Sequence, residues 1–216
     1  VKKYLKGFGI SVPIRYISHH EGHAAHYYNS WFSEATVIVI DSIGEWDTTT
    51  IWKAKDNNLK RKYSTRYPDS LGLFYSSMTK RCGLIPQKDE SKLDSWEGYV
   101  DPIVKSAIEN DFIFPHKWKP IFNVNMHRGI GNWRPSFEPD EIAPAAQAVF
   151  EDMVMKISDY AQSKLPSKNL VLSGGCAFNR GIRPKLNKKW DNVYYPPNPG
   201  DAGSAETCVL AYLRNI

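Results

Sequence analysis

Four of the six histidines of the chain fall within residues 19–26. Side chains four positions apart lie on one face of a helix, so His19 and His23 can direct two imidazoles at one ion. A divalent metal needs further ligands, which makes this pair half of a metal site. A polar helix face is the alternative explanation. His20 and His26 lie off the shared face and are weaker candidates.

Two aspartates stand at the boundaries of predicted elements. Asp41 ends the β-branched run 35–41, which predicts a buried strand. A charge at that place requires a partner, although a turn-capping role explains it equally well. Asp201 opens the last predicted helix after a Pro/Gly-rich loop, where an N-cap role is the simpler explanation.

Glycines follow two of the predicted strands. Gly44 and Glu45 join two strands, and a glycine hairpin offers backbone N–H groups to phosphate. Gly174 and Gly175 stand between a strand and a predicted helix through Asn179, an arrangement that favours anions. Each signal is weak alone, because hairpins need glycine anyway.

The elements that must position these residues follow from periodicity. Ser18 is suited to cap the histidine helix, and Pro166 ends a long helix after Asp140. The segment 86–138 carries scattered Pro, Gly and Trp and predicts an irregular insertion or lid. We expect strands at 14–18, 35–41, 48–54, 59–64, 169–172 and 193–195, and helices at 19–28, 70–82, 140–165 and 202–213. A meander followed by helix, strand, strand and helix is typical of a ribonuclease-H-like α/β domain.

Composition narrows the class of protein. The 216 residues, 42% hydrophobic and 24% charged, suit one or two globular domains. Three distant cysteines form neither a disulfide framework nor a metal knuckle. The absence of an apolar run and of a signal-like start predicts a cytoplasmic protein with no membrane span. The net charge of +5 suits phosphate-bearing ligands or nucleic acid, but a solvated basic surface is the favoured explanation.

Six motifs, in the same order along nearly the whole chain, resemble the carbamoyltransferase family that includes nodulation-factor and antibiotic O-carbamoyltransferases. The first is the histidine motif at 19–25, and VIDSIGEWDTT at 39–49 is similar to DGxGEWxTT. The others are DSLGLFYS at 69–76, EIAPAAQAVFE at 141–151, LSGGCAFN at 172–179 and PNPGDAGSA at 197–205, which resemble HSLGLFYS, DIAAAAQxxFE, LxGGVALN and PxxxDxGxAxGAA.

The resemblance implies an actin-like ATPase fold, with residues 1–34 as the tail of a first lobe and 35–216 as a complete second lobe carrying the 86–138 insertion. It implies a divalent ion (Fe, Zn, Mn or Mg) on the ligands His19, His23, Asp41 and Asp201, the first three being catalytic. ATP phosphates would lie near Gly44 and Glu45, and adenosine or carbamoyladenylate near Gly174, Gly175 and Asn179. The implied activity takes carbamoyl from carbamoyl phosphate, carries it as carbamoyladenylate, and passes it to a hydroxyl of a small-molecule acceptor.

The chain departs from the family pattern in several places. EYKVMGLAPYG is reduced to ESKLDSWEGY at 90–99, and GAAL to ETCVL at 206–210. Family members are also longer, with an earlier lobe and a carbamoyl-adenylating domain. We therefore expect a fragment, a split-gene product or a subunit whose partner chain supplies those parts.

Two alternatives stay open. A tRNA threonylcarbamoyl transferase shares the H-x-E-G-H pattern, but its SGGHT stretch is missing here, and Gly44-Glu45-Trp46 favours the carbamoyl branch, so nucleic acid is the less favoured partner. The other alternative is a non-catalytic relic that binds metal or nucleotide.

Overall fold

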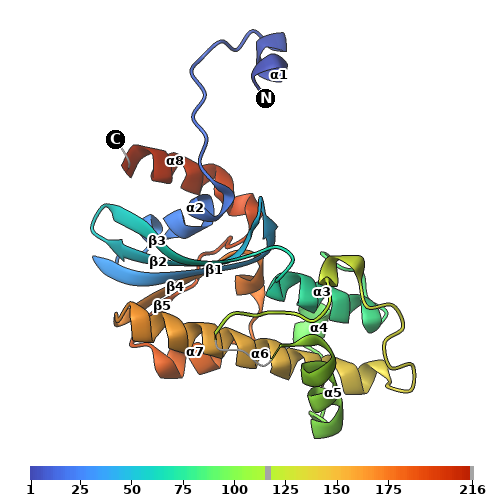
Figure 1. Cartoon of the computed structure of the whole chain (residues 1–216). Helices are drawn as coiled ribbons and strands as arrows, with labels where there is room; N and C mark the ends of the chain where they lie inside the picture. The colour runs from blue at the N-terminus through green and yellow to red at the C-terminus, as the bar shows by residue number, and fades with distance from the viewer. Residues whose placement is uncertain (115–117, 215–216) are drawn as a thin grey trace.

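A five-stranded mixed sheet forms the centre of the computed structural model, which describes residues 1–114 and 118–214 (Figure 1). The strand order is β3-β2-β1-β4-β5. The antiparallel meander contributes β1 (Glu34–Gly44), β2 (Asp47–Lys55) and β3 (Asn58–Arg66). The strand β4 (Asn169–Ser173) pairs with β1 in parallel, and β5 (Asn192–Tyr194) pairs with β4 in parallel. The predicted meander and the two later strands are thus confirmed.

The sequence of β1 explains why the sheet is covered on both faces. Its buried residues alternate, because successive side chains of a strand point to opposite faces. Val37 and Val39 belong to one apolar cluster with Ala24 and Tyr27. Ile38 and Ile40 belong to the larger cluster on the other face.

Helices pack on each face accordingly. The valine side carries α2 (His19–Ala24), the 3₁₀ turn η1 (Ala25–Asn29) and α8 (Ser204–Arg214), as Figure 1 shows above the sheet. The isoleucine side carries α3 (Leu71–Arg81), α6 (Pro139–Lys164) and α7 (Arg183–Lys189). The capping box between Glu138 and Glu141 fixes the start of α6.

The segment 86–138 is more regular than expected. It contains α4 (Glu90–Asp94), α5 (Pro102–Phe112) and the 3₁₀ turn η2 (Met126–Arg128), and part of it lies outside the described residues. The side chain of Asp101 caps α5 through the Ile103 and Val104 amides, and Pro102 occupies the first turn. This N-terminal signal was present in the sequence but was hidden by the surrounding Gly and Trp.

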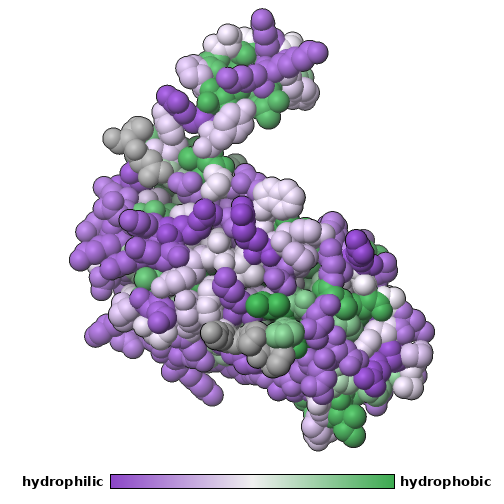
Figure 2. Space-filling model, in the orientation of Figure 1, coloured by the Kyte–Doolittle hydropathy of each residue, from purple (hydrophilic) through white to green (hydrophobic). Residues whose placement is uncertain are grey.

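The predicted strand at 14–18 is wrong. These residues run without strand pairing from α1 (Lys2–Gly7), which buries none of its residues, down to α2. Residues 1–18 form an arm that stands away from the body in Figure 1, and Figure 2 shows hydrophobic side chains at its tip. A β-like sequence pattern forms a strand only where a neighbouring strand accepts its hydrogen bonds. None of the helices that the structure describes is long and apolar enough to cross a membrane.

Candidate metal centre

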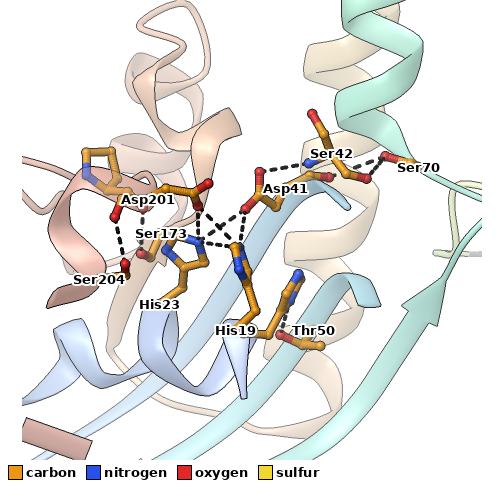
Figure 3. A network of polar contacts seen from close by, with 11 residues as sticks. His19, His23, Asp41, Ser42, Thr50, Ser70, Ser173, Asp201 and Ser204 are labelled. Carbon is orange, nitrogen blue, oxygen red and sulfur yellow. Dashed lines mark hydrogen bonds and ion pairs between the residues drawn. The ribbon is translucent and has the colours of Figure 1, made fainter. Parts of the chain in front are cut away.

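Four side chains from three distant segments converge at one end of the sheet (Figure 3). Their potential ligand atoms all lie within 4.8 Å of one another. The Nε2 atoms of His19 and His23 are 3.0 Å apart. Each lies 3.1 Å from Asp41 Oδ2, and the distances to Asp201 Oδ1 are 3.3 and 3.2 Å. The structure thus brings together all the residues that the sequence pointed to as metal ligands.

The local fold explains the convergence. His19 and His23 share one face of α2, as their spacing predicts. Ser18 is the N-cap residue, but its hydroxyl donates to Glu21 instead of accepting a backbone N–H. Asp41 lies in a register shift between Ile40 and Gly44, which releases this stretch from the β2 ladder. Asp201 begins the 3₁₀ turn η4 (Asp201–Gly203) that leads into α8.

The electrostatics favour a charged aspartate between the two imidazoles. Burial opposes ionisation of Asp41, but hydrogen bonds from His19 and His23 outweigh it and hold the pKa of the carboxyl far below its usual value. The hydrogen bond to Asp41 raises the pKa of His19 against the opposing effect of burial. The Ser42 amide donates to Asp41 Oδ1 at 2.8 Å, which leaves Oδ2 facing the histidines.

The donor set fits a divalent transition metal. Two imidazole nitrogens and two carboxylate oxygens are ligands that Fe, Zn or Mn accept. The two Nε2 atoms lie 3.0 Å apart and both face Asp41 Oδ2 and Asp201 Oδ1, so one ion between them would reach all four side chains. His23 is buried, with 1% of its side chain exposed, whereas Asp201 is 75% exposed. The cluster is therefore closed on the α2 side and open at Asp201.

The predicted glycines lie directly beside this cluster. Gly44 packs so closely on the rings of His19 and His20 that a Cβ there would collide with both. Gly174, at φ 88°, packs on the backbone of Ile40, and its amide donates to Pro199 O. A Cβ on Gly175 would lie 3.0 Å from Asp41 Oδ1. These glycines therefore serve packing around the site, whatever they contribute to a ligand.

Glu45 and Asn179 are the other residues predicted to bind nucleotide. Glu45 is free to contact a ligand from solvent, whereas the side chain of Asn179 is already hydrogen-bonded. Glu45 is exposed in the hairpin turn and contributes to the raised pKa of His19. The Asn179 amide is held by Gln147 at 2.9 and 3.1 Å and by Tyr75 Oη at 3.3 Å. The predicted helix after Gly175 is only the 3₁₀ turn η3 (Gly175–Phe178), which presents fewer aligned N–H groups than an α-helix.

The two weaker histidine candidates are core residues. His20 is buried, and its Nδ1 lies 2.9 Å from Thr50 Oγ1. His26 is buried where α8 begins, against Gly203. Burial lowers the pKa of His20 to about 3 and that of His26 to about 4, so both imidazoles are neutral near pH 7.

Several residues around the site have no predicted role. Ser70 and Gly72 at the start of α3 pack on the Asp41–Ser42 peptide. The insertion reaches the hairpin through His127, whose ring contacts Tyr67, which in turn contacts Trp46. The motif at 69–76 contains both Ser70 and Gly72, but a sequence motif does not show which residues they contact.

Comparison with known proteins gives the family context. The family model described as the carbamoyltransferase N-terminus matches residues 8–209. A protein of uncharacterised function from Synechocystis sp. is 30% identical over 232 residues, covering 94% of this chain and 38% of the relative. The tRNA N6-adenosine threonylcarbamoyltransferase of Streptococcus pneumoniae is 32% identical over 76 residues, covering 34% of this chain and 23% of that enzyme.

Two solved structures confirm the predicted actin-like ATPase fold. The activator of the 2-hydroxyisocaproyl-CoA dehydratase from Clostridium difficile, with bound ADPNP, has a TM-score of 0.57 at 18% identity, covering 96% of this chain and 70% of that one. Full-length HypF in its phosphate- and nucleotide-bound form has a TM-score of 0.58 at 11% identity, covering 97% of this chain and 37% of the HypF chain. At these identities the likeness establishes the fold alone.

Proposed function

Because the chain belongs to the carbamoyltransferase N-terminus family, we propose that it carries the metal- and nucleotide-binding site of an O-carbamoyltransferase. The chain spans 38% of the length of the Synechocystis relative, so the activity proposed is that of a whole enzyme to which this chain contributes. The substrates proposed are ATP, carbamoyl phosphate and a small hydroxyl-bearing acceptor.

The convergence of His19, His23, Asp41 and Asp201 within 4.8 Å is the observation that carries the proposal. An ion held by these residues would orient phosphate and acceptor oxygens and offset the negative charge that develops on them. A structural ion pair alone would leave unexplained why the exposed Asp201 joins the two imidazoles at 3.2 and 3.3 Å.

The residues of the chain would act mainly by positioning. In the transfer, an acceptor hydroxyl oxygen bonds to the carbamoyl carbon and its proton passes to solvent, while the bond from that carbon to the AMP phosphate oxygen breaks and AMP leaves with its electron pair. Asp41 stays ionised because of its histidine partners, and His23 is held rigidly by burial. Such fixed groups accelerate a reaction chiefly by holding the reacting atoms in line.

The nucleotide is proposed to lie along Gly44, Glu45, Gly174 and Gly175. These residues lie beside the metal cluster, where Gly44 packs on the rings of His19 and His20 and a Cβ on Gly175 would lie 3.0 Å from Asp41 Oδ1. The ADPNP-bound activator and the phosphate- and nucleotide-bound HypF share this fold, which supports nucleotide binding by this chain. Asn179 would first have to release Gln147 before it could contact adenosine.

Calorimetry with metal and nucleotide tests the proposal. We expect the purified chain to bind one divalent ion and, once loaded, a non-hydrolysable ATP analogue. Nucleotide binding should weaken strongly when the metal is removed by a chelator. A chain that binds metal but no nucleotide would be the non-catalytic relic, and a chain that binds neither would overturn the proposal.

A tRNA-directed threonylcarbamoyl transferase is the second candidate, favoured by the partial likeness to the Streptococcus pneumoniae enzyme. A gel shift of tRNA at increasing salt separates the two candidates, because phosphate contacts lose affinity steeply with salt. Retention of tRNA at physiological salt would favour this second function. No retention is the result that O-carbamoylation of a small molecule predicts.

The proposed partner is a chain or segment that supplies a first lobe and a carbamoyl-adenylating domain. The exposed apolar residues of the arm, among them Tyr4, Phe8 and Val12, support this proposal because water is a poor environment for them. Co-purification with such a partner, and formation of carbamoyladenylate only by the pair, would test it.

A further inference from the structure

The first turn of α3 packs on the backbone that carries Asp41. This turn belongs to the motif at 69–76, which the proposed chemistry leaves without a role. Gly72 faces the Asp41–Ser42 peptide so closely that a Cβ would lie 2.7 Å from Ser42 N and 2.8 Å from both Asp41 C and Asp41 O. These are backbone atoms, which cannot move aside as the end of a flexible side chain would. Only glycine allows the helix to approach this closely.

Ser70 holds the same stretch of backbone through hydrogen bonds. It is fully buried, and its hydroxyl donates to Ser42 O at 2.6 Å and lies 3.3 Å from Asp41 O. The same oxygen accepts the Leu73 amide at 3.1 Å, as an N-cap residue does. Figure 3 shows Ser70 next to Ser42, with the Asp41 carboxylate turned toward the histidines. The start of α3 and the end of β1 are therefore held together by one buried hydroxyl.

The contact has a direct consequence for the carboxylate. Asp41 stands in the register shift of β1, where pairing with β2 does not fix the backbone. Its Oδ1 accepts the Ser42 amide, so the position of Ser42 also orients the carboxylate and its Oδ2. The same turn connects to the insertion, because Asp69 Oδ1 accepts the Phe122 amide at 3.0 Å.

We propose that Ser70 and Gly72 are positioning residues that set Asp41 in the metal cluster. They touch neither the ion nor a substrate and act only through the Asp41–Ser42 backbone. The inference rests on the proposed metal site and adds to it the element that fixes one of its ligands. Residues that orient a ligand in this way typically change metal affinity about 10- to 100-fold when they are replaced.

Two variants with matched controls test this role. Gly72→Ala adds a methyl group against the peptide, and Gly7→Ala adds the same group where nothing lies within 4 Å. Ser70→Ala removes the fastening hydroxyl, and Ser76→Ala removes one from the same helix that bonds Glu90 instead. Alanine is the better helix former, so any loss in Gly72→Ala comes from the contact.

Cobalt(II) binding is the measurement, by calorimetry for affinity and by visible absorption for ligand geometry. We expect Gly72→Ala and Ser70→Ala to weaken cobalt binding about tenfold or more and to shift the absorption bands, whereas both controls match the wild type. A folded Gly72→Ala with wild-type affinity and spectrum would overturn the inference. If Gly72→Ala does not fold, Ser70→Ala against Ser76→Ala decides alone.

Failure of the proposed function is distinguishable from failure of this inference. A wild-type chain that binds no cobalt refutes the metal site, and the role of α3 is then read from hydrogen exchange of the Ser42 amide. Loss of protection there in Ser70→Ala but not in Ser76→Ala upholds the positioning of the Asp41–Ser42 peptide. Equal protection in the two variants overturns it.

Discussion

At the scale of residues, the site depends on carboxylate and imidazole side chains that are held very close together. Asp41 lies 3.1 Å from both His19 and His23, and Asp201 completes the group at 3.2 and 3.3 Å. Each of these residues has an ordinary structural explanation when it is taken alone. Their convergence is the observation that favours the proposed metal site over a helix cap or a polar helix face.

Replacing His23 by Ala should remove stoichiometric metal binding. The variant loses a buried ligand whose Nε2 lies at the centre of the cluster. His127→Ala is the control, because His127 is exposed on the insertion and outside the cluster. Metal analysis of the dialysed proteins makes the comparison. Retained stoichiometric binding in His23→Ala would contradict the ligand assignment.

Acid should destabilise the metal-free protein partly through His26. Burial holds its folded-state pKa at about 4, below the ordinary value of 6.5. Between these values the unfolded chain binds the extra proton, so stability is full above about pH 6.5 and falls as pH drops toward 4. We expect His26→Gln to reduce the loss between pH 7 and pH 5 by about 2 kcal/mol, measured by urea unfolding in a chelator. An unchanged pH dependence would show that His26 is not buried in its neutral form.

At the scale of elements, close backbone packing determines where the ligands stand. Gly44, Gly72 and Gly174 each lie against the backbone or the rings of the metal cluster or of an adjacent residue. They come from the β1–β2 hairpin, from α3 and from the turn after β4. Small residues at these three contacts let the elements approach closely enough for the ligands to converge.

Gly174→Ala should be more destabilising than Gly129→Ala. Both glycines have similar backbone angles, φ 88° and ψ 165° for Gly174 and φ 75° and ψ 174° for Gly129, so both variants incur backbone strain of about 1–3 kcal/mol. Only Gly174 also lies against a backbone, that of Ile40, whereas a Cβ on Gly129 has nothing within 4 Å. Urea unfolding compares the two. Equal losses would show that the contact with Ile40 is easily relieved.

The sequence predicts helices and strands well where the spacing of hydrophobic residues is regular over a long segment. The meander and the helices at 71–81 and 139–164 follow from alternation and from 3–4-residue spacing. The strand predicted at 14–18 is wrong because strand formation depends on a neighbouring strand, which the local sequence does not reveal. The helix of the histidines changes to a 3₁₀ turn at Ala25, a detail of tertiary packing that periodicity does not record.

The site was predictable to a different extent. Helical spacing alone identifies His19 and His23, because the two are close in sequence. Asp41 and Asp201 required the family pattern, since nothing local links residues so far apart. The roles of Ser70 and Gly72 depend on atomic contacts between α3 and β1, which a motif does not contain.

At the scale of the whole molecule, the arm contributes little to the described body. Tyr4, Phe8 and Val12 are all mostly exposed, and α1 has no buried residue. Deleting residues 1–12 should therefore leave the midpoint of thermal unfolding unchanged, because no buried apolar area is lost. A clear fall in the midpoint would show that the arm packs on the body in solution. A truncation that ends inside α2 is the matched control and should unfold the protein.

The proposed function requires one divalent ion held by two histidines and two aspartates at the end of the sheet. X-ray absorption spectroscopy of the iron- or zinc-loaded chain tests this ligand set. We expect one ion per chain, with two imidazoles and carboxylate oxygens bound to it at about 2.0–2.2 Å. A first shell without imidazole, or one unaltered in His23→Ala, would contradict it.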